Sequence, residues 1–300
     1  DLSTGNYALI ATDANGCQVD TAITLLAPTP LDVILSSAVT AGGTNIACAG
    51  GATGSITTSV TGGQPAYTYT WTGPGGTVLN GADLQDLGAG LYELTLSDAL
   101  GCSTTASIVL TEPDTLAVSF TVSDIGGFGT SCSANDGSIS TTITGGSPGY
   151  VVQWTGPNGF SSNLTNLTDL VAGTYLATVT DANGCIVQGV VTLDAAPPVF
   201  VDLAPAPGAC AGDGLGGISS TITGGIAPFQ YTWTGPDGFT SNAPELIDVV
   251  DGTYVLTVTD TLGCIATTST TLAGPAPLAS NLVPSFYGLY NIRCAGDSSG

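Results

Sequence analysis

The sequence has no histidine and no lysine, and Arg293 is its only basic residue. Its 23 acidic side chains give a formal net charge of −22, which would repel nucleic acid and anionic membrane surfaces. Without His or Lys, no ordinary base is available to activate a Ser or Thr nucleophile. No pair of carboxylates of the glycosidase kind stands out from the acids in the turns. We therefore expect a protein that is not an enzyme, uses no cofactor and binds no nucleic acid.

Long apolar runs are missing as well. None approaches the roughly 20 residues that a membrane-spanning helix needs, so we expect no membrane insertion in this segment. The sequence shows no signal peptide; it starts inside one repeat and stops inside another. These features predict an excised segment of a longer secreted protein.

What the sequence does contain is one stretch that occurs four times with small changes, in the form Gly-Thr-Tyr followed by Asp-Ala-Asn-Gly-Cys. The copies begin at Gly5, Gly90, Gly173 and Gly252. Their tyrosines are Tyr7, Tyr92, Tyr175 and Tyr254, and their cysteines are Cys17, Cys102, Cys185 and Cys264. A near-constant period of this length indicates tandem repeats. We expect the second half of a repeat at 1–27, complete repeats at 28–112, 113–195 and 196–274, and the first part of another at 275–300.

The sequence pattern of each complete repeat predicts a set of short strands. In the first, Tyr67, Tyr69 and Trp71 alternate with threonines, which places the three aromatic rings on one face of a strand. Turn signals every eight to twelve residues and the absence of a helical period indicate an all-β sandwich. A tryptophan on a central strand and a tyrosine just after a glycine are typical of the immunoglobulin-like plan with its tyrosine corner. We predict a tandem array of such sandwiches with about seven strands each and core tryptophans Trp71, Trp154 and Trp233.

Eight cysteines are spread regularly, one near the start and one near the end of each repeat. A sandwich of roughly 80 residues has a small core and gains from a covalent staple. Regular cysteines in small domains point to an oxidising location, outside the cell or on its surface. A zinc site is the alternative to disulfides for these cysteines, but the sequence has neither His nor Cys-x-x-Cys. We expect each repeat to be stapled by a disulfide.

The cysteine spacing favours one pairing. From the early to the late cysteine of a repeat it is 54, 53 and 54 positions, whereas the spacing across the junctions varies more. This favours bonds within the repeats, namely Cys48–Cys102, Cys132–Cys185 and Cys210–Cys264. Cys17 and Cys294 would then be bonded to partners outside the segment. The immunoglobulin-like plan, however, puts the loop before the second strand and the turn before the last strand at opposite ends of a sandwich. Bonds between neighbouring repeats are therefore the competing prediction.

Two further candidate sites have ordinary alternatives. The Trp-Thr-Gly-Pro turns are followed by Phe160 and Phe239, which can present rings to a sugar. A phenylalanine that packs on its own turn is the favoured interpretation, because the first repeat has Thr77 at this place. An array of carbohydrate-binding modules is thus the alternative function.

The hairpin turns offer Asp13 with Asn15 and Asp181 with Asn183 as oxygen ligands for calcium. The other two copies of the turn have Leu100 and Leu262 in place of the asparagine. Asp and Asn also form turns by themselves, so we predict turns without a metal.

The full series of motifs resembles the SprB repeat: Cys, Gly-Ser-Ile, Thr-Gly-Gly, Pro-x-Tyr, Trp-Thr-Gly-Pro-x-Gly, Gly-Thr-Tyr and Asp-Ala-Asn-Gly-Cys. That family builds very large surface adhesins of gliding bacteria with type IX secretion. The resemblance covers nearly the whole chain. It implies an exported, cell-surface or extracellular filamentous product with a role in adhesion or in movement over surfaces.

The resemblance also implies partners and a modification. The partners are neighbouring repeats of the same chain, identical chains in a filament, and surface glycans or the substratum. Exported proteins of such bacteria are often O-glycosylated at Asp-Thr or Asp-Ser followed by an apolar residue, a pattern that fits Thr21, Thr115 and Thr261.

Overall fold

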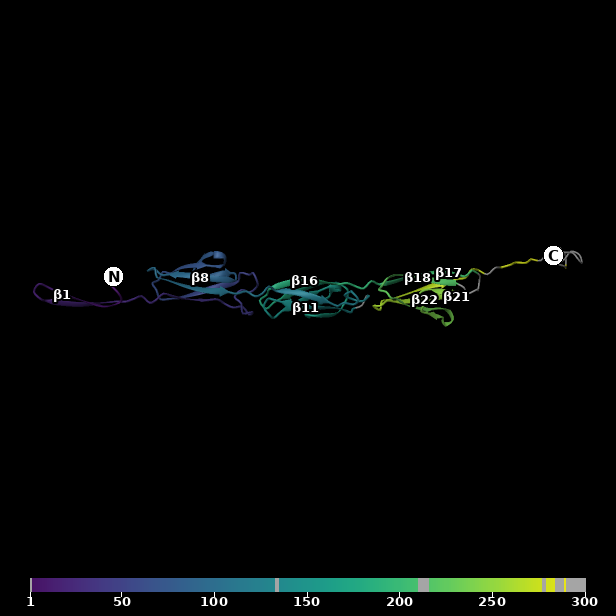
Figure 1. Ribbon diagram of the computed structural model, residues 1–300, viewed down its shortest axis with the longest axis horizontal. Helices are drawn as coiled ribbons and strands as arrows, with labels where there is room; N and C mark the ends of the chain where they lie inside the picture. Colours follow the sequence, from purple (N-terminus) through teal and green to yellow (C-terminus); the bar gives the residue numbers. More distant parts are fainter. Residues whose placement is uncertain (1, 133–134, 210–215, 277–278, 284–288, 290–300) are drawn as a thin grey trace. The chain divides into compact units, whose positions relative to one another are not determined.

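The structure is a computed structural model that describes residues 2–132, 135–209, 216–276, 279–283 and 289 (Figure 1). Contacts between residues divide the chain into two compact units. The first holds Asp1–Thr121, Ile139–Leu167 and Thr174–Val191. The second holds Val122–Ser138, Thr168–Gly173 and the chain from Thr192 onward. None of the helices in the described ranges has the length and hydrophobicity needed to cross a membrane.

An antiparallel hairpin comes first. Strands β1 (Gly5–Thr12) and β2 (Gln18–Leu25) pair along their whole length, with Tyr7 opposite Ile23. Nearly every residue of the two strands is exposed, because no second sheet covers either face. The hairpin corresponds to the last two strands of the sandwiches that follow.

Seven strands and a 3₁₀ turn form the first sandwich. One sheet has the order β3-β4-β7 and the other has the order β6-β5-β8-β9, with antiparallel neighbours throughout. The elements are β3 (Asp32–Ser36), β4 (Gly54–Thr61), β5 (Thr68–Thr72), η1 (Pro74–Gly76), β6 (Val78–Asn80), β7 (Leu84–Leu87), β8 (Gly90–Ser97) and β9 (Ser103–Leu110).

The same order of elements recurs twice. In the second sandwich the sheets are β10-β11-β14 and β13-β12-β15-β16, and in the third they are β17-β18-β21 and β20-β19-β22-β23. The second set is β10 (Ala117–Val122), β11 (Gly137–Thr144), β12 (Val151–Thr155), η2 (Pro157–Gly159), β13 (Ser161–Ser162), β14 (Leu167–Leu170), β15 (Gly173–Thr180) and β16 (Ile186–Leu193). The third set is β17 (Val199–Ala206), β18 (Gly216–Gly224), β19 (Gln230–Thr234), η3 (Pro236–Gly238), β20 (Thr240–Ser241), β21 (Leu246–Val249), β22 (Gly252–Thr259) and β23 (Ile265–Leu272). The prediction of tandem, seven-stranded immunoglobulin-like sandwiches is confirmed.

Each sandwich is built around one tryptophan. Trp71 is fully buried on β5, opposite Leu94 of β8, and it packs with Ile56 of the other sheet. Its indole Nε1 donates to Gly81 O at 3.0 Å, so the polar edge of the ring is satisfied inside the core. Trp154 and Trp233 are buried in the same way and donate to Leu164 O at 3.1 Å and to Ala243 O at 2.9 Å.

The Gly-x-Tyr motif packs against the Trp-Thr-Gly-Pro turn of the same sandwich. Gly90, which opens β8, has φ +141°, and a Cβ on it would overlap the ring of Pro74. Two residues later, Tyr92 is buried and its hydroxyl donates to Gly88 O at 3.1 Å. This is a tyrosine corner. Burial raises the pKa of the Tyr92 hydroxyl.

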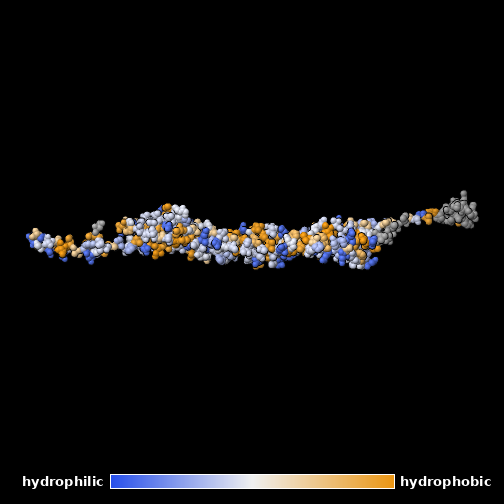
Figure 2. Space-filling model, viewed as in Figure 1, coloured by the Kyte–Doolittle hydropathy of each residue, from blue (hydrophilic) through white to orange (hydrophobic). Residues whose placement is uncertain are grey.

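Outside the cores the surface is mixed. Figure 2 shows hydrophobic and hydrophilic residues interspersed over the visible face, as the low content of charged residues requires. The exposed large side chains include Ile247 and Val250 of the third sandwich and Leu100 of the first. Single exposed apolar residues of this kind are normal on a soluble domain.

Candidate functional site at the disulfide-bridged junctions

Disulfides connect neighbouring sandwiches. Cys48 bonds Cys185 with a Cα–Cα distance of 5.7 Å, and Cys132 bonds Cys264 with a Cα–Cα distance of 5.5 Å. Cys48 and Cys132 each lie in the loop between the first two strands of a sandwich, which we call the first loop. Each late cysteine ends the turn between the last two strands of a sandwich, which we call the last turn. The first loop of one sandwich is thus bonded to the last turn of the next.

The favoured prediction of bonds within the repeats is therefore wrong. Cys48 is not bonded to Cys102, whose thiol is free and exposed, and Cys132 is not bonded to Cys185. Cys264 takes Cys132 as its partner, which excludes the bond to Cys210, while Cys210 and Cys294 themselves lie outside the described residues. Cys17, like Cys102, is free and exposed.

The physical reason lies in the length of a strand. Asn45 and Ile46 of the first loop donate their N–H groups to Thr111 O at 2.9 and 3.0 Å, just past the end of β9. Cys102 lies at the other end of β9, whose eight residues span about 26 Å. Disulfide-bonded cysteines have Cα atoms at most about 6.8 Å apart. A bond inside one sandwich cannot bridge that length.

Chain direction brings the right pair together instead. The first loop lies where the chain leaves a sandwich, next to Thr111. The last turn lies where the chain comes into a sandwich, since Gly146 N donates to Asp114 O at 2.8 Å and Ser147 N donates to Asp181 at 2.8 Å. The second junction repeats this arrangement: Thr130 N donates to Asp194 O at 3.1 Å, and Gly225 N donates to Pro198 O at 3.2 Å.

An aspartate organises every last turn. Asp181 Oδ1 accepts from the N–H groups of Asn183 and Cys185 at 2.9 and 2.8 Å, while its Oδ2 accepts from Ser147 N. Asp98 and Asp260 make the same three bonds, with Gln64 and Ile226 in the place of Ser147. The carboxylate fixes the backbone of the turn and hence the position of the cysteine.

These bonds also set the acidity of the aspartates. Burial raises the pKa of Asp260, but the N–H donors from Ile226, Cys264, Leu262 and Gly263 outweigh it and hold the pKa below the ordinary value of 3.8. The pKa of Asp181 is lowered by the same balance. At Asp98 the largest cause of the lowered pKa is the bond from Gln64 N.

The lowered pKa values predict acid sensitivity. A carboxylate whose pKa is lower in the folded state stabilises the fold above its unfolded value of about 3.8, and this contribution is lost as the pH falls through the folded pKa. We expect the melting temperature of the third sandwich to fall below about pH 4 and to fall less steeply in Asp260→Asn, measured by calorimetry. Asp202→Asn, at an exposed position of β17, is the control and should keep the wild-type slope.

The two junctions differ in chemistry. At the first, the Asn183 side chain reaches the neighbouring sandwich, with Nδ2 3.1 Å from Ala47 O and 3.3 Å from Thr40 Oγ1. The same Nδ2 donates to Ser147 Oγ at 2.6 Å within its own sandwich. A Cβ on Gly42 of the first loop would overlap the Ser147 side chain. Asn183 therefore acts as a polar contact between sandwiches.

At the second junction Leu262 takes the place of Asn183. A Cβ on Gly126, whose φ is +63°, would lie 2.8 Å from Leu262 Cδ2. Cys264 is 2% exposed and belongs to the core cluster of the third sandwich, against which Cys132 and Leu262 pack. The apolar contact replaces the hydrogen bonds of the first junction.

The other predicted site residues lie apart from the junction chemistry. Asp13 Oδ1 accepts from Asn15 N and Cys17 N at 2.9 Å each, as a turn-forming aspartate does. Among the described residues no group of three or more His, Cys, Asp or Glu is arranged to hold a metal. The three candidate glycosylation positions are exposed, at Thr21, Thr115 and Thr261.

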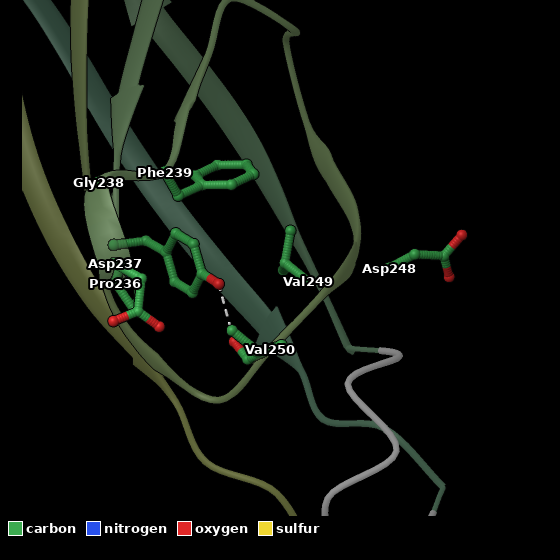
Figure 3. A pocket seen from close by; sticks show the side chains of 8 residues that line it. Pro236, Asp237, Gly238, Phe239, Asp248, Val249 and Val250 are labelled. Atoms are coloured by element: carbon green, nitrogen blue, oxygen red, sulfur yellow. Dashed lines mark hydrogen bonds between the residues drawn. The ribbon is translucent and has the colours of Figure 1, made fainter.

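The phenylalanines after the Trp-Thr-Gly-Pro turns pack on the corner tyrosines. Phe239 and Tyr254 make an edge contact, with ring centroids 5.6 Å apart and planes at 85°, and Phe160 contacts Tyr175 in the same manner. Figure 3 shows Phe239 at the side of a pocket. Tyr254 also lines this pocket, and its hydroxyl donates to Val250 O at 2.8 Å. Asp237 and Asp248 are also among the residues that line that pocket.

Non-reducing peptide mapping should show the junction bonds directly. An endoprotease that cuts at acidic residues suits this chain, which has a single basic residue. We expect disulfide-linked peptides that contain Cys48 with Cys185 and Cys132 with Cys264. A peptide linking Cys48 to Cys102 would contradict the structure.

Comparison with known protein families gives matches in two parts of the chain. Residues 41–76 and 204–238 match the SprB repeat. Two segments of the chain are thus similar to SprB repeats. The first match runs from the first loop, with Cys48, through the core strand to the turn at Pro74, and the second covers the corresponding part of the third sandwich. The recognition of SprB repeats from the motif series is thereby confirmed.

No curated protein matches the chain. Among solved structures, the chain is similar to Sidekick-1 immunoglobulin domains 1–5, with 13% identity and a TM-score of 0.34 over 90% of this chain and 66% of that one. It is also similar to a tetra-tandem repeat in the extending region of a large adhesion protein, with 20% identity and a TM-score of 0.31 over 91% of this chain and 83% of that one. At these identities the likeness concerns the fold alone.

Proposed function

We propose that the chain is a non-catalytic segment of a large secreted adhesin or extracellular filament, in which SprB-repeat sandwiches are bonded in series. The observation that carries the proposal is the disulfide between each first loop and the next last turn. Such bonds form in oxidising locations, which supports a place outside the cell or on its surface. The units of the array are the predicted repeats 28–112, 113–195 and 196–274, flanked by the partial repeats 1–27 and 275–300.

The cross-links suit a load-bearing role. In a repeat protein, neighbouring units stabilise one another through their shared contacts. A covalent bond at the junction adds to this, because one sandwich cannot move away from the next without breaking a bond. Adhesion to a surface, or movement over it, places a mechanical load on the protein that connects the cell to the substratum.

Labelling of intact cells tests the proposal. Fab fragments raised against residues 28–274 should label the surface of unpermeabilised cells and reduce their attachment to, or movement over, a solid surface. Fab fragments against an unrelated surface protein are the control. Labelling that appears only after permeabilisation would contradict a surface location, and labelled cells with unchanged attachment and movement would contradict the adhesive role.

Two finer features belong to the same proposal. Sideways association of identical chains in a filament is the first, and electron microscopy of the native material should then show a lattice and not single strands. O-glycosylation of Thr21, Thr115 and Thr261 is supported by their exposure. Intact-mass analysis of exported protein without added hexose would contradict it.

A second candidate function is glycan binding at the pocket in Figure 3. Its lining combines the half-buried Phe239 with the exposed residues Asp237 and Asp248, a mixture of apolar and acceptor groups that sugars bind. Binding on a glycan array that is lost in Phe239→Ala and kept in Ile247→Ala would support it. Binding that survives Phe239→Ala would exclude this pocket.

A further inference from the structure

The four last turns differ at their third residue, which alternates between asparagine and leucine along the chain. The third residue of the turn is Asn15 in the hairpin, Leu100 in the first sandwich, Asn183 in the second and Leu262 in the third. Two of these turns hold the first loop of a neighbouring sandwich, one through Asn183 and one through Leu262. The contacts of these two side chains show which kind of first loop each one faces.

Asn183 selects a polar first loop. Its amide faces a backbone carbonyl and a threonine hydroxyl of the segment from Thr40 to Cys48. A leucine at this place would leave Ala47 O and Thr40 Oγ1 facing an apolar side chain.

Leu262 selects an apolar first loop. It lies against the backbone of Gly126 in the segment from Asp124 to Cys132 and packs with Cys132 on the core cluster of the third sandwich. An asparagine at this place would bring its amide against a glycine backbone and an apolar cluster. The two kinds of first loop are therefore matched to the two kinds of last turn.

The turn that ends at Cys102 has the same form. Asp98 accepts from Leu100 N at 3.0 Å, Cys102 N at 2.8 Å and Gln64 N at 2.9 Å, as the aspartates of the two bonded turns do. The Cys102 thiol is free and exposed, and Leu100 is 66% exposed. The turn is thus already shaped for a first loop, and its apolar side chain and its thiol both face solvent.

We propose that the turn Asp98–Cys102 is a docking site for a cysteine-bearing first loop of the apolar kind, from another SprB-type repeat, and that Leu100 determines this specificity. By the same rule the turn Asp13–Cys17, with Asn15, takes a first loop of the polar kind. The bond forms when the two thiols lose two protons and two electrons to a disulfide donor, which is reduced to its dithiol. The inference rests on the junction contacts and is independent of adhesion.

Two peptides test the specificity. One spans residues 123–136 and carries Cys132; the other spans residues 38–52 and carries Cys48. Each is activated as a mixed disulfide with thionitrobenzoate, so that attack by a thiolate of the chain forms the chain–peptide disulfide and releases one thionitrobenzoate. The protein is the oxidised 300-residue chain with Cys17, Cys210 and Cys294 replaced by serine, and the rate of thionitrobenzoate release is measured.

Cys102 should react about tenfold faster with the peptide that carries Cys132, since burying one leucine against an apolar loop contributes more than 1.4 kcal/mol. Leu100→Asn should reverse the preference, and Leu91→Asn, at an exposed position of β8, should leave it unchanged. In a companion protein with Cys102→Ser and an intact Cys17, the peptide that carries Cys48 should react faster. Circular dichroism checks that each variant is folded. Equal rates for the two peptides at folded Cys102, or a preference unchanged by Leu100→Asn, would overturn the proposal.

Discussion

Replacing Trp233 with alanine should lower the free energy of unfolding of the third sandwich by about 3–5 kcal/mol, the range for removing a large aromatic ring from a core. The indole is 0% exposed and bonds Ala243 O, so the substitution leaves both a cavity and a carbonyl without its donor. A small sandwich has little stability to lose. Hydrogen exchange along β22, measured as a function of urea, should show the effect.

Ile247→Ala is the matched control. Ile247 lies on β21 of the same sandwich but is 72% exposed, so its truncation should change the free energy of unfolding by less than about 0.5 kcal/mol. Hydrogen exchange along β8, in the first sandwich, should keep its wild-type dependence on urea in both variants. A Trp233→Ala protein with unchanged exchange on β22 would show that the ring does not hold this core together.

Removing the second junction bond has the next largest expected effect. In Cys132→Ala with Cys264→Ala, the free energy of unfolding of the third sandwich should fall by about 2–4 kcal/mol, because the disulfide no longer restricts the unfolded chain. Cys264 is also part of the core cluster, and alanine fills its place only in part. Hydrogen exchange along β22, measured as a function of urea, reports this change.

Two controls accompany that variant. Cys48→Ala with Cys185→Ala removes the other junction bond and should leave the unfolding transition of the third sandwich, measured by exchange along β22, close to wild type. Cys102→Ala removes a free, exposed thiol and should change neither transition. A third sandwich that is equally stable with and without the Cys132–Cys264 bond would show that the cross-link does not stabilise the fold.

Much of the fold follows from local patterns that the sequence displays. The alternation of Tyr67, Tyr69 and Trp71 identifies a core strand, since every second side chain of a strand faces the same way. The glycine before each corner tyrosine marks a backbone angle that other residues avoid, as Gly90 shows with φ +141°. Both signals are local, so they can be read without knowing how the strands pair.

The cysteine pairing, in contrast, depends on how the strands are arranged in the folded sandwiches. A constant spacing between Cys48 and Cys102 shows that they belong to one repeat, but it does not place them at the same end of a strand. The information needed was the direction of the chain: the first loop lies where the chain leaves a sandwich, and the last turn lies where it comes into the next. This follows from the immunoglobulin-like plan, which already favoured the competing prediction.

The junction contacts of Asn183 and Leu262 do not follow from the sequence either. In the sequence these residues are only a match to a calcium pattern and a departure from it, because an isolated turn gives no indication of a second surface beside it. Their alternation with Asn15 and Leu100 was the available signal. It becomes interpretable once Gly126 and Ala47 are known to lie against these side chains.

The two disulfides overlap along the chain. Cys132 lies between Cys48 and Cys185, and Cys185 lies between Cys132 and Cys264, so every peptide bond from Cys48 to Cys264 is inside at least one closed covalent loop. One cut by a protease anywhere in this interval would leave the two parts of the chain bonded to each other. Disulfides confined to single repeats would leave each junction dependent on one strand of backbone. The staggered arrangement thus gives a surface protein tolerance to a single break.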